Sequence, residues 1–219
     1  MRAFTDLLML ADGRFPAGGH AHSGGLEAAV AHGRVRDLDG LRAFLRGRLR
    51  TAGLVGAAFA AAACARPEAM EALEEDLDAR TPSPALRLAA RRQGRSLCRA
   101  ALVVWPGEHV TRAAKARVSQ PIALGVAAHA AGLSPEEAAL LAAYHAVSGP
   151  ASAAVRLLGL DPYRVHAVLA ELAGECDEVA REAATHARGP VEDLPAASAP
   201  LLDVSAEDHA AWEVRLFAS

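Results

Sequence analysis

A glycine-rich segment near the start of the chain carries the residues best suited to chemistry. Residues 18–25 read Gly-Gly-His-Ala-His-Ser-Gly-Gly, which places imidazoles and a hydroxyl among glycines that permit close backbone approach. A phosphate-binding loop would need a Gly-Lys-Ser/Thr ending, and the segment has none. A serine nucleophile elbow would need glycine two residues before Ser23, but Ala21 stands there. Neither chemistry fits the segment.

The spacing of His20 and His22 leaves a metal site open, with His32 nearby in sequence. A zinc site takes three or four ligands, and no acidic or cysteine ligand accompanies the two histidines. We favour a tight turn that lets one helix backbone approach another, with Ser23 capping the next helix. We therefore expect no resident metal. A metal-dependent hydrolase using His20 and His22 is the alternative function.

The remaining titratable residues are not arranged for catalysis. His129 and His145 lie in alanine-rich stretches that are typical of packed helices. The acidic residues between 71 and 78 follow a proline and read as a solvated helix face. No carboxylate pair stands in an apolar pattern of the kind that raises a pKa for acid–base catalysis. The residues alone therefore predict no catalytic residues and no cofactor.

Composition excludes several other classes of function. The formal charge of −3 gives no general reason to bind nucleic acid, and the arginines near 42–50 and 87–99 read as solvated helix faces. Three cysteines, far apart in apolar surroundings, indicate reduced thiols rather than disulfides. The longest uncharged stretch, residues 51–65, is shorter than the roughly 20 residues of a membrane span. We expect a cytoplasmic protein without a membrane segment.

The same composition predicts an all-α fold. Hydrophobic residues make up 52% of the chain but aromatic residues only 4%, so alanine and leucine must form the core. Alanine favours helix, and its small side chain requires helices to approach closely. We expect a single-domain helical bundle of roughly eight to ten helices with a C-terminal arm. The expected helices span residues 4–10, 25–32, 37–65, 67–80, 83–104, 109–116, 120–132, 134–158 and 161–189.

Capping residues and prolines define these boundaries. Ser134 precedes a proline and stands three residues before Glu137, which predicts a capping box. Asp37 and the Ser83-Pro84 pair give similar helix starts, and Gly33 predicts a left-handed helix end. Gly149-Pro150 falls inside the expected helix 134–158, so we expect a kink there or two helices.

The C-terminal part has a different character. Residues 190–200 contain three prolines and small residues without periodicity, which predicts an extended arm tethering the final segment 207–219. We accordingly divide the chain into a bundle, 1–189, and an arm with a short helix, 190–219. The apolar end of this segment either packs back on the bundle or docks into a groove of a partner protein.

The chain resembles the urease accessory protein UreF family. Residues 15–27, Phe-Pro-Ala-Gly-Gly-His-Ala-His-Ser-Gly-Gly-Leu-Glu, are similar to that family's N-terminal signature, and His209 with residues 215–219 is similar to its closing segment. His20 stands where many relatives have an aromatic residue, and residues 105–120 match poorly. Further similar stretches occur in the expected order at 84–88, 94–95, 125–128 and 153–157.

The resemblance implies a non-catalytic scaffold in urease maturation. UreF proteins are cytosolic all-α dimers that join a UreD/UreH-type protein and the GTPase UreG to deliver nickel to apo-urease, and they are thought to couple GTPase turnover to metal transfer. The C-terminal arm of the family is implicated in contact with the UreD/UreH-type partner. We therefore expect partner contacts at His20, His22, Ser23, Glu27, His209, Arg215, Leu216 and Phe217.

Overall fold

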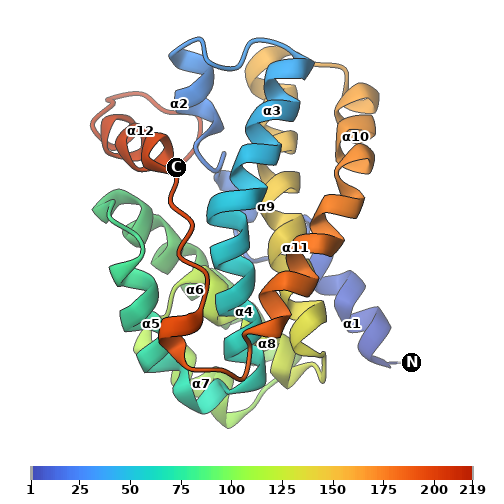
Figure 1. The fold of residues 1–219 in the computed structure, drawn as a ribbon, viewed down its shortest axis with the longest axis vertical. Helices are drawn as coiled ribbons and strands as arrows, with labels where there is room; N and C mark the ends of the chain where they lie inside the picture. Colours follow the sequence, from blue (N-terminus) through green and yellow to red (C-terminus); the bar gives the residue numbers. More distant parts are fainter. Residues whose placement is uncertain (1, 219) are drawn as a thin grey trace.

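The computed structural model describes residues 2–218, and its regular secondary structure in that range is helical (Figure 1). The all-α prediction is confirmed. The α-helices are α1 (Arg2–Ala11), α2 (Leu26–Ala31), α3 (Leu38–Arg48), α4 (Leu54–Ala65), α5 (Met70–Ala79), α6 (Pro84–Val104), α7 (Glu108–Ala116), α8 (Gln120–Ala130), α9 (Pro135–Leu158), α10 (Pro162–Glu171), α11 (Ala173–Thr185) and α12 (Pro200–Ala210). Short turns of other helix types are η1 (Gly19–Ala21), η2 (Leu49–Gly53), η3 (Pro67–Ala69) and η4 (Val191–Asp193).

The core is built around α4 and α9, which pack against each other and against α8 and α11. From Ala57 to Ala63, every residue of α4 is fully buried. Gly125 of α8 shows how close the helices come. A Cβ at this glycine would lie 2.9 Å from the backbone nitrogen of Cys64, and closer still to the carbonyl oxygen of Ala60. Small side chains therefore stabilise this core through near backbone-to-backbone contact.

The helix 134–158 is continuous as α9, so the alternative of two helices broken at Gly149-Pro150 is wrong. Pro150 is buried against the turn around Gly24, and this packing accommodates the proline within the helix. α9 is also long and apolar enough for a membrane span, but 56% of its apolar window is buried inside the bundle, as in a core helix.

Two expected helices are subdivided. The expected helix 37–65 consists of α3 and α4 joined by η2, a π-helical turn with five residues. The expected helix 161–189 divides at Leu172 into α10 and α11 and ends before the predicted Gly189. These divisions explain why the chain has more helices than predicted.

The predicted caps are confirmed. Ser134 forms a capping box with Glu137, Ser83 accepts a hydrogen bond from the Leu86 N–H, and Asp37 accepts one from the Gly40 N–H. Gly33 has a φ of 67°, as a left-handed helix end requires.

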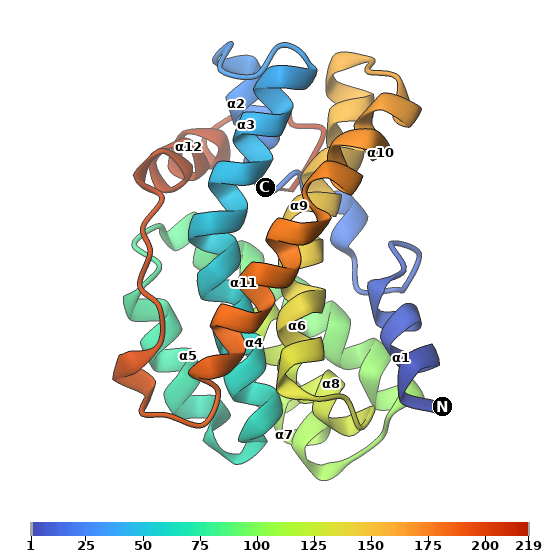
Figure 2. The same cartoon turned by 45° about the vertical axis from the view of Figure 1, so that its right-hand side comes forward.

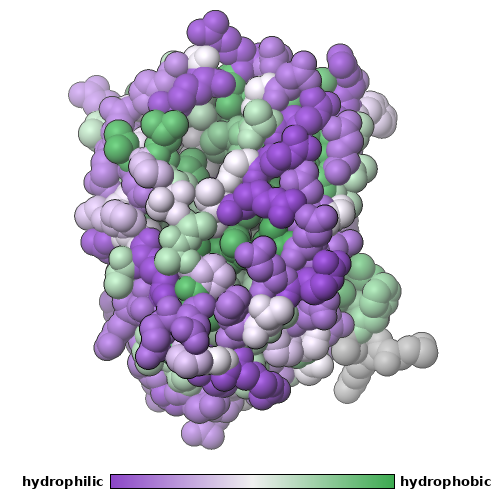
Figure 3. Space-filling view, viewed as in Figure 1, coloured by the Kyte–Doolittle hydropathy of each residue, from purple (hydrophilic) through white to green (hydrophobic). Residues whose placement is uncertain are grey.

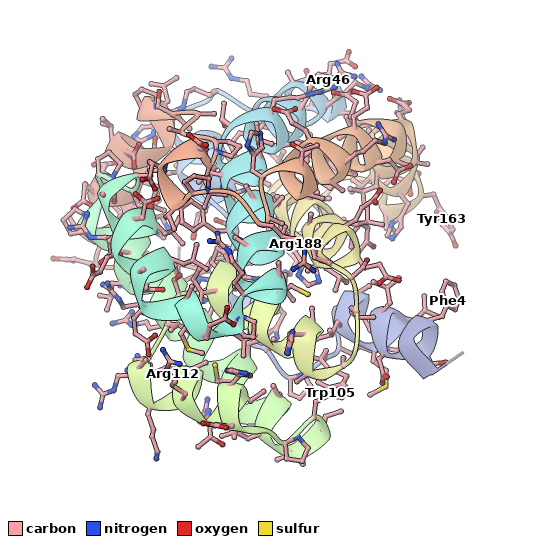
Figure 4. The ribbon with its side chains drawn as sticks, turned by 60° about the horizontal axis from the view of Figure 1, so that its bottom comes forward. Phe4, Arg46, Trp105, Arg112, Tyr163 and Arg188 are labelled. Carbon is pink, nitrogen blue, oxygen red and sulfur yellow. The ribbon has the colours of Figure 1, made fainter. Side chains whose placement is uncertain are left out.

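Arginines on α3 form ion pairs with α10 and α11. Arg42 pairs with Glu171 and Arg46 with Glu175, each at 2.7 Å. Figure 4 shows Arg46 on the outer side of the molecule, where such pairs contribute little free energy. Arg42 and Arg46, which were predicted to lie on a solvated helix face, are thus at the surface but form ion pairs with glutamates.

After α11 the chain runs along the outside of the bundle past α5 and then forms α12 beside α2 and α6 (Figure 2). The final helix begins at Pro200, earlier than the expected segment 207–219, because Pro200 takes the first helical turn. Residues 211–218, which we call the tail, follow α12 without helical structure and return to the glycine-rich segment.

Candidate functional site

A buried carboxylate, Glu27, holds the tail on the glycine-rich segment. Its Oε1 accepts a hydrogen bond from the Leu216 N–H at 2.8 Å, and its Oε2 accepts one from the Phe217 N–H at 3.0 Å. The Nε2 of His209 lies 2.8 Å from the same Oε2. Because an ionised carboxylate only accepts, His209 is the donor. We call these four residues the Glu27 clamp.

The glycine-rich turn positions Glu27. Gly24 and Gly25 both have positive φ, 62° and 89°, which glycine adopts without strain. This turn starts α2 so that Glu27 lies in its first turn, where the helix dipole favours a carboxylate. Ser23 is fully buried, and its Oγ accepts the Glu27 N–H at 3.2 Å. The N-cap residue of α2 is Gly25, so the prediction that Ser23 is the cap is wrong in position, although Ser23 does accept a first-turn N–H.

The other side of the Glu27 clamp is supplied by α12. His209 lies at the end of this helix, is buried, and packs against the indole of Trp212 with ring centres 4.8 Å apart. The Trp212 Nε1 donates to the Asp208 carboxylate. The Oδ2 of Asp208 also lies 3.2 Å from the Nε2 of His32, the residue that follows α2. The imidazole that meets Glu27 is therefore held in place by neighbours on both segments.

The last residues of the tail pack along η1. Phe217 is buried, with the Arg156 guanidinium 4.4 Å from its ring centre, a cation–π arrangement. Arg156 also donates to the carbonyl oxygen of His20 at 3.0 Å. The Ala218 N–H donates to the carbonyl oxygen of Ala21 at 2.7 Å. The apolar end of the chain thus packs back on its own bundle, one of the two expected arrangements.

Further hydrogen bonds anchor α12. Arg34 donates to the Ser205 hydroxyl at 2.6 Å. Glu207 accepts hydrogen bonds from the Ser83 hydroxyl and from the Ala85 N–H, which together hold its pKa below the usual value. α12 is consequently fixed to both α2 and α6.

The structure separates the predicted site residues into two groups. Ser23, Glu27, His209 and Phe217 are buried together, whereas the side chains of His20, Arg215 and Leu216 are exposed. His22 is half-buried, and burial together with nearby Arg92 and His20 lowers its pKa. Within residues 2–218, no group of three histidine, cysteine or acidic residues is placed to hold a metal ion.

Several contributors were not predicted. Arg156, Trp212 and Arg34 carry no local sequence pattern that would connect them to Glu27. Arg156 does fall in one of the stretches similar to the UreF family, but that similarity assigned it no role.

Outside the Glu27 clamp, the C-terminal region presents apolar side chains to solvent. Leu201 and Val204, three residues apart on α12, are 67% and 68% exposed. Val214 and Leu216 of the tail are exposed as well. Figure 3 shows apolar side chains over the position of α12. Buried polar contacts therefore fix the inner face of this region, while its outer face carries exposed apolar side chains among charged ones.

Comparison with known proteins gives consistent matches. The UreF family model matches residues 35–173. A urease accessory protein UreF from Mycobacterium sp. (strain JLS) is 47% identical over 219 residues, covering all of both chains. The protein of the same name from Mycolicibacterium vanbaalenii is also 47% identical, and that from Mycobacterium tuberculosis (strain ATCC 25177 / H37Ra) is 42% identical over 95% of both chains.

Proposed function

This chain belongs to the UreF family of urease accessory proteins, and from that premise we propose that it is a scaffold for nickel insertion into apo-urease. In this role it would join a UreD/UreH-type protein and the GTPase UreG in the cytoplasm and modulate the GTPase turnover of UreG. The relatives are named as accessory proteins, which accords with a non-catalytic role.

We propose that the outer face of α12 and the tail binds the UreD/UreH-type partner. The observation that carries this proposal is the exposed apolar set Leu201, Val204, Val214 and Leu216 on a segment fixed from below by the Glu27 clamp. A fixed segment loses less conformational entropy on binding than a flexible one, so more of the free energy from burying its apolar area remains as affinity. In this arrangement Ser23, Glu27, His209 and Phe217 position the surface, and His20, Arg215 and Leu216 lie where a partner can touch them.

We also propose that the chain forms a homodimer through a different face, which likewise carries exposed apolar side chains. Phe4 and Leu8 of α1 are 64% and 55% exposed, and Tyr163 of α10 is exposed too. Figure 4 shows Phe4 and Tyr163 projecting away from the bundle on the same side. These side chains offer apolar area to a second copy, separate from the surface proposed for the UreD/UreH-type partner.

Co-expression with the UreD/UreH-type protein tests the partner surface. We expect the double variant Leu201→Asp/Val204→Asp to reduce the recovered partner at least tenfold, because two charges replace exposed apolar contacts. Val103→Asp is the matched control, since Val103 is 83% exposed at the far end of α6. Deleting residues 207–219 should abolish capture with helix content by circular dichroism nearly unchanged. Full recovery with the double variant and with the deletion would refute the proposed surface.

A further inference from the structure

Arg48 is a partly buried cation without a carboxylate partner among the described residues. Among residues 2–218, the one hydrogen bond of its side chain runs from Nε to the carbonyl oxygen of Ala146 at 3.1 Å, and no carboxylate pairs with the guanidinium. Its neighbour Arg46, by contrast, pairs with Glu175. Burial lowers the pKa of Arg48 to about 10, which leaves the guanidinium charged at neutral pH. The remaining guanidinium N–H groups can therefore donate to a bound anion.

The backbone around Arg48 is built to hold this side chain in one place. Arg48 ends α3, directly before the π-helical turn η2, and such turns are frequent at functional sites. A Cβ at Gly24 would lie 3.1 Å from the Arg48 Cζ and 3.0 Å from the Pro150 Cγ. The guanidinium therefore lies against the glycine-rich turn and α9 in a space that exists because residue 24 has no side chain.

Arg48 lines a cavity of about 390 Å³ between α2, α3 and the start of α12. Figure 1 shows these three helices near one another in the upper part of the molecule. The charged side chains in the wall of this cavity are Arg34 and Arg48, and no acidic residue described by the structure lines it. The remaining wall is largely apolar, including Ala29, Val35, Phe44 and Leu202. Arg48 also borders a second cavity, whose wall includes Asp78 and Asp203.

We propose that this cavity binds a monocarboxylate with a short apolar chain. The carboxylate pairs with the Arg48 guanidinium, whose planar fork matches two carboxylate oxygens. The apolar chain lies between α3 and α12, where it leaves water for apolar walls. The absence of acidic residues from the described wall favours an anion, and the volume is in the range of small-molecule sites.

Octanoate, octanol and acetate, titrated into the full chain, test the two parts of the site separately. We expect octanoate to bind and to raise Tm, octanol to bind at least tenfold more weakly, and acetate to bind at least tenfold more weakly as well. Arg48→Met should weaken octanoate binding at least tenfold and leave Tm without ligand nearly unchanged, since the Arg48 side chain makes one hydrogen bond and no ion pair among the described residues. Arg95→Met, an exposed arginine of α6, is the control and should bind octanoate normally.

A second variant keeps the test decisive if Arg48→Met does not fold. Gly47 lines the cavity in α3, and a Cβ there would meet no atom within 4 Å. Gly47→Leu should therefore fold, fill the cavity and weaken octanoate binding at least tenfold. Octanoate binding that survives both substitutions would overturn the proposal. If octanol bound as tightly as octanoate, the carboxylate would make no contribution and the site would be an apolar cavity. If acetate bound as tightly as octanoate, the apolar chain of the ligand would make no contribution. Either result contradicts the proposed ligand class.

Discussion

Glu27 receives three hydrogen bonds at once, from His209 and from the backbone N–H groups of Leu216 and Phe217. Glu27→Ala would leave these donors, two of them on the buried residues His209 and Phe217, without an acceptor. We expect the free energy of unfolding to fall by about 3 kcal/mol, measured by urea denaturation followed by circular dichroism. Glu213→Ala, at an exposed carboxylate of the tail, is the control and should change stability by less than about 0.5 kcal/mol. An equal effect of both substitutions would contradict the Glu27 clamp.

Single residues differed in how far the sequence revealed them. A contact of Ser23 with the start of α2 could be predicted because its hydrogen bond to Glu27 is local, but the cap itself is Gly25. Glu27 and His209 were selected from the resemblance to the UreF family, but their contact spans 182 positions, which no periodicity encodes. The sequence predicted Arg48 to lie on a solvated helix face with the neighbouring arginines. In the structure its guanidinium lies against the turn at Gly24, a contact that no local pattern indicates.

Among the helices, the contact between α4 and α8 depends most on the absence of a side chain. Gly125→Ala would force Cβ against the backbone of α4 near Cys64, so we expect a loss of about 2–3 kcal/mol in the free energy of unfolding. Gly174→Ala is the matched control, because that exposed position in α11 has no atom within 4 Å of an added Cβ. It should stabilise by about 0.5–1 kcal/mol through helix propensity. Chemical denaturation of both variants measures the difference, and a neutral Gly125→Ala would contradict the close packing.

Helix starts were more predictable than helix interruptions. Ser83 and Ser134 cap through side-chain hydrogen bonds within three residues, so a short motif contains the whole cause. The π-helical turn at 49–53 and the division at Leu172 have no proline or glycine pair to mark them. Gly149-Pro150 led to the opposite error, because it suggested a break where α9 is continuous. Pro150 is buried against the turn at Gly24, and this packing supports a helix that local propensity would end.

For the whole molecule, composition predicted the fold class and the family resemblance predicted the role, but neither predicted how the chain closes. An alanine-rich, aromatic-poor sequence requires close helix packing, and the core around α4 and α9 has it. The tail returns past the bundle to pair with a segment near the other end of the chain. This closure brings the two ends of the UreF resemblance, residues 15–27 and the region from His209 onward, into a single site.

Closure through Glu27 predicts that the two ends are energetically coupled. Removing the tail after Ala210 should lower the free energy of unfolding by about 2–4 kcal/mol, because Glu27 then loses two of its three donors and Arg156 loses its contact with Phe217. If Glu27 is what holds the tail, the truncation should cost at least about 1 kcal/mol less in the Glu27→Ala background. Urea denaturation of the four proteins in this cycle measures the coupling. Additive losses would mean that the tail is stabilised independently of Glu27. The contacts of Arg156 and Ala21 would then be what closes the chain.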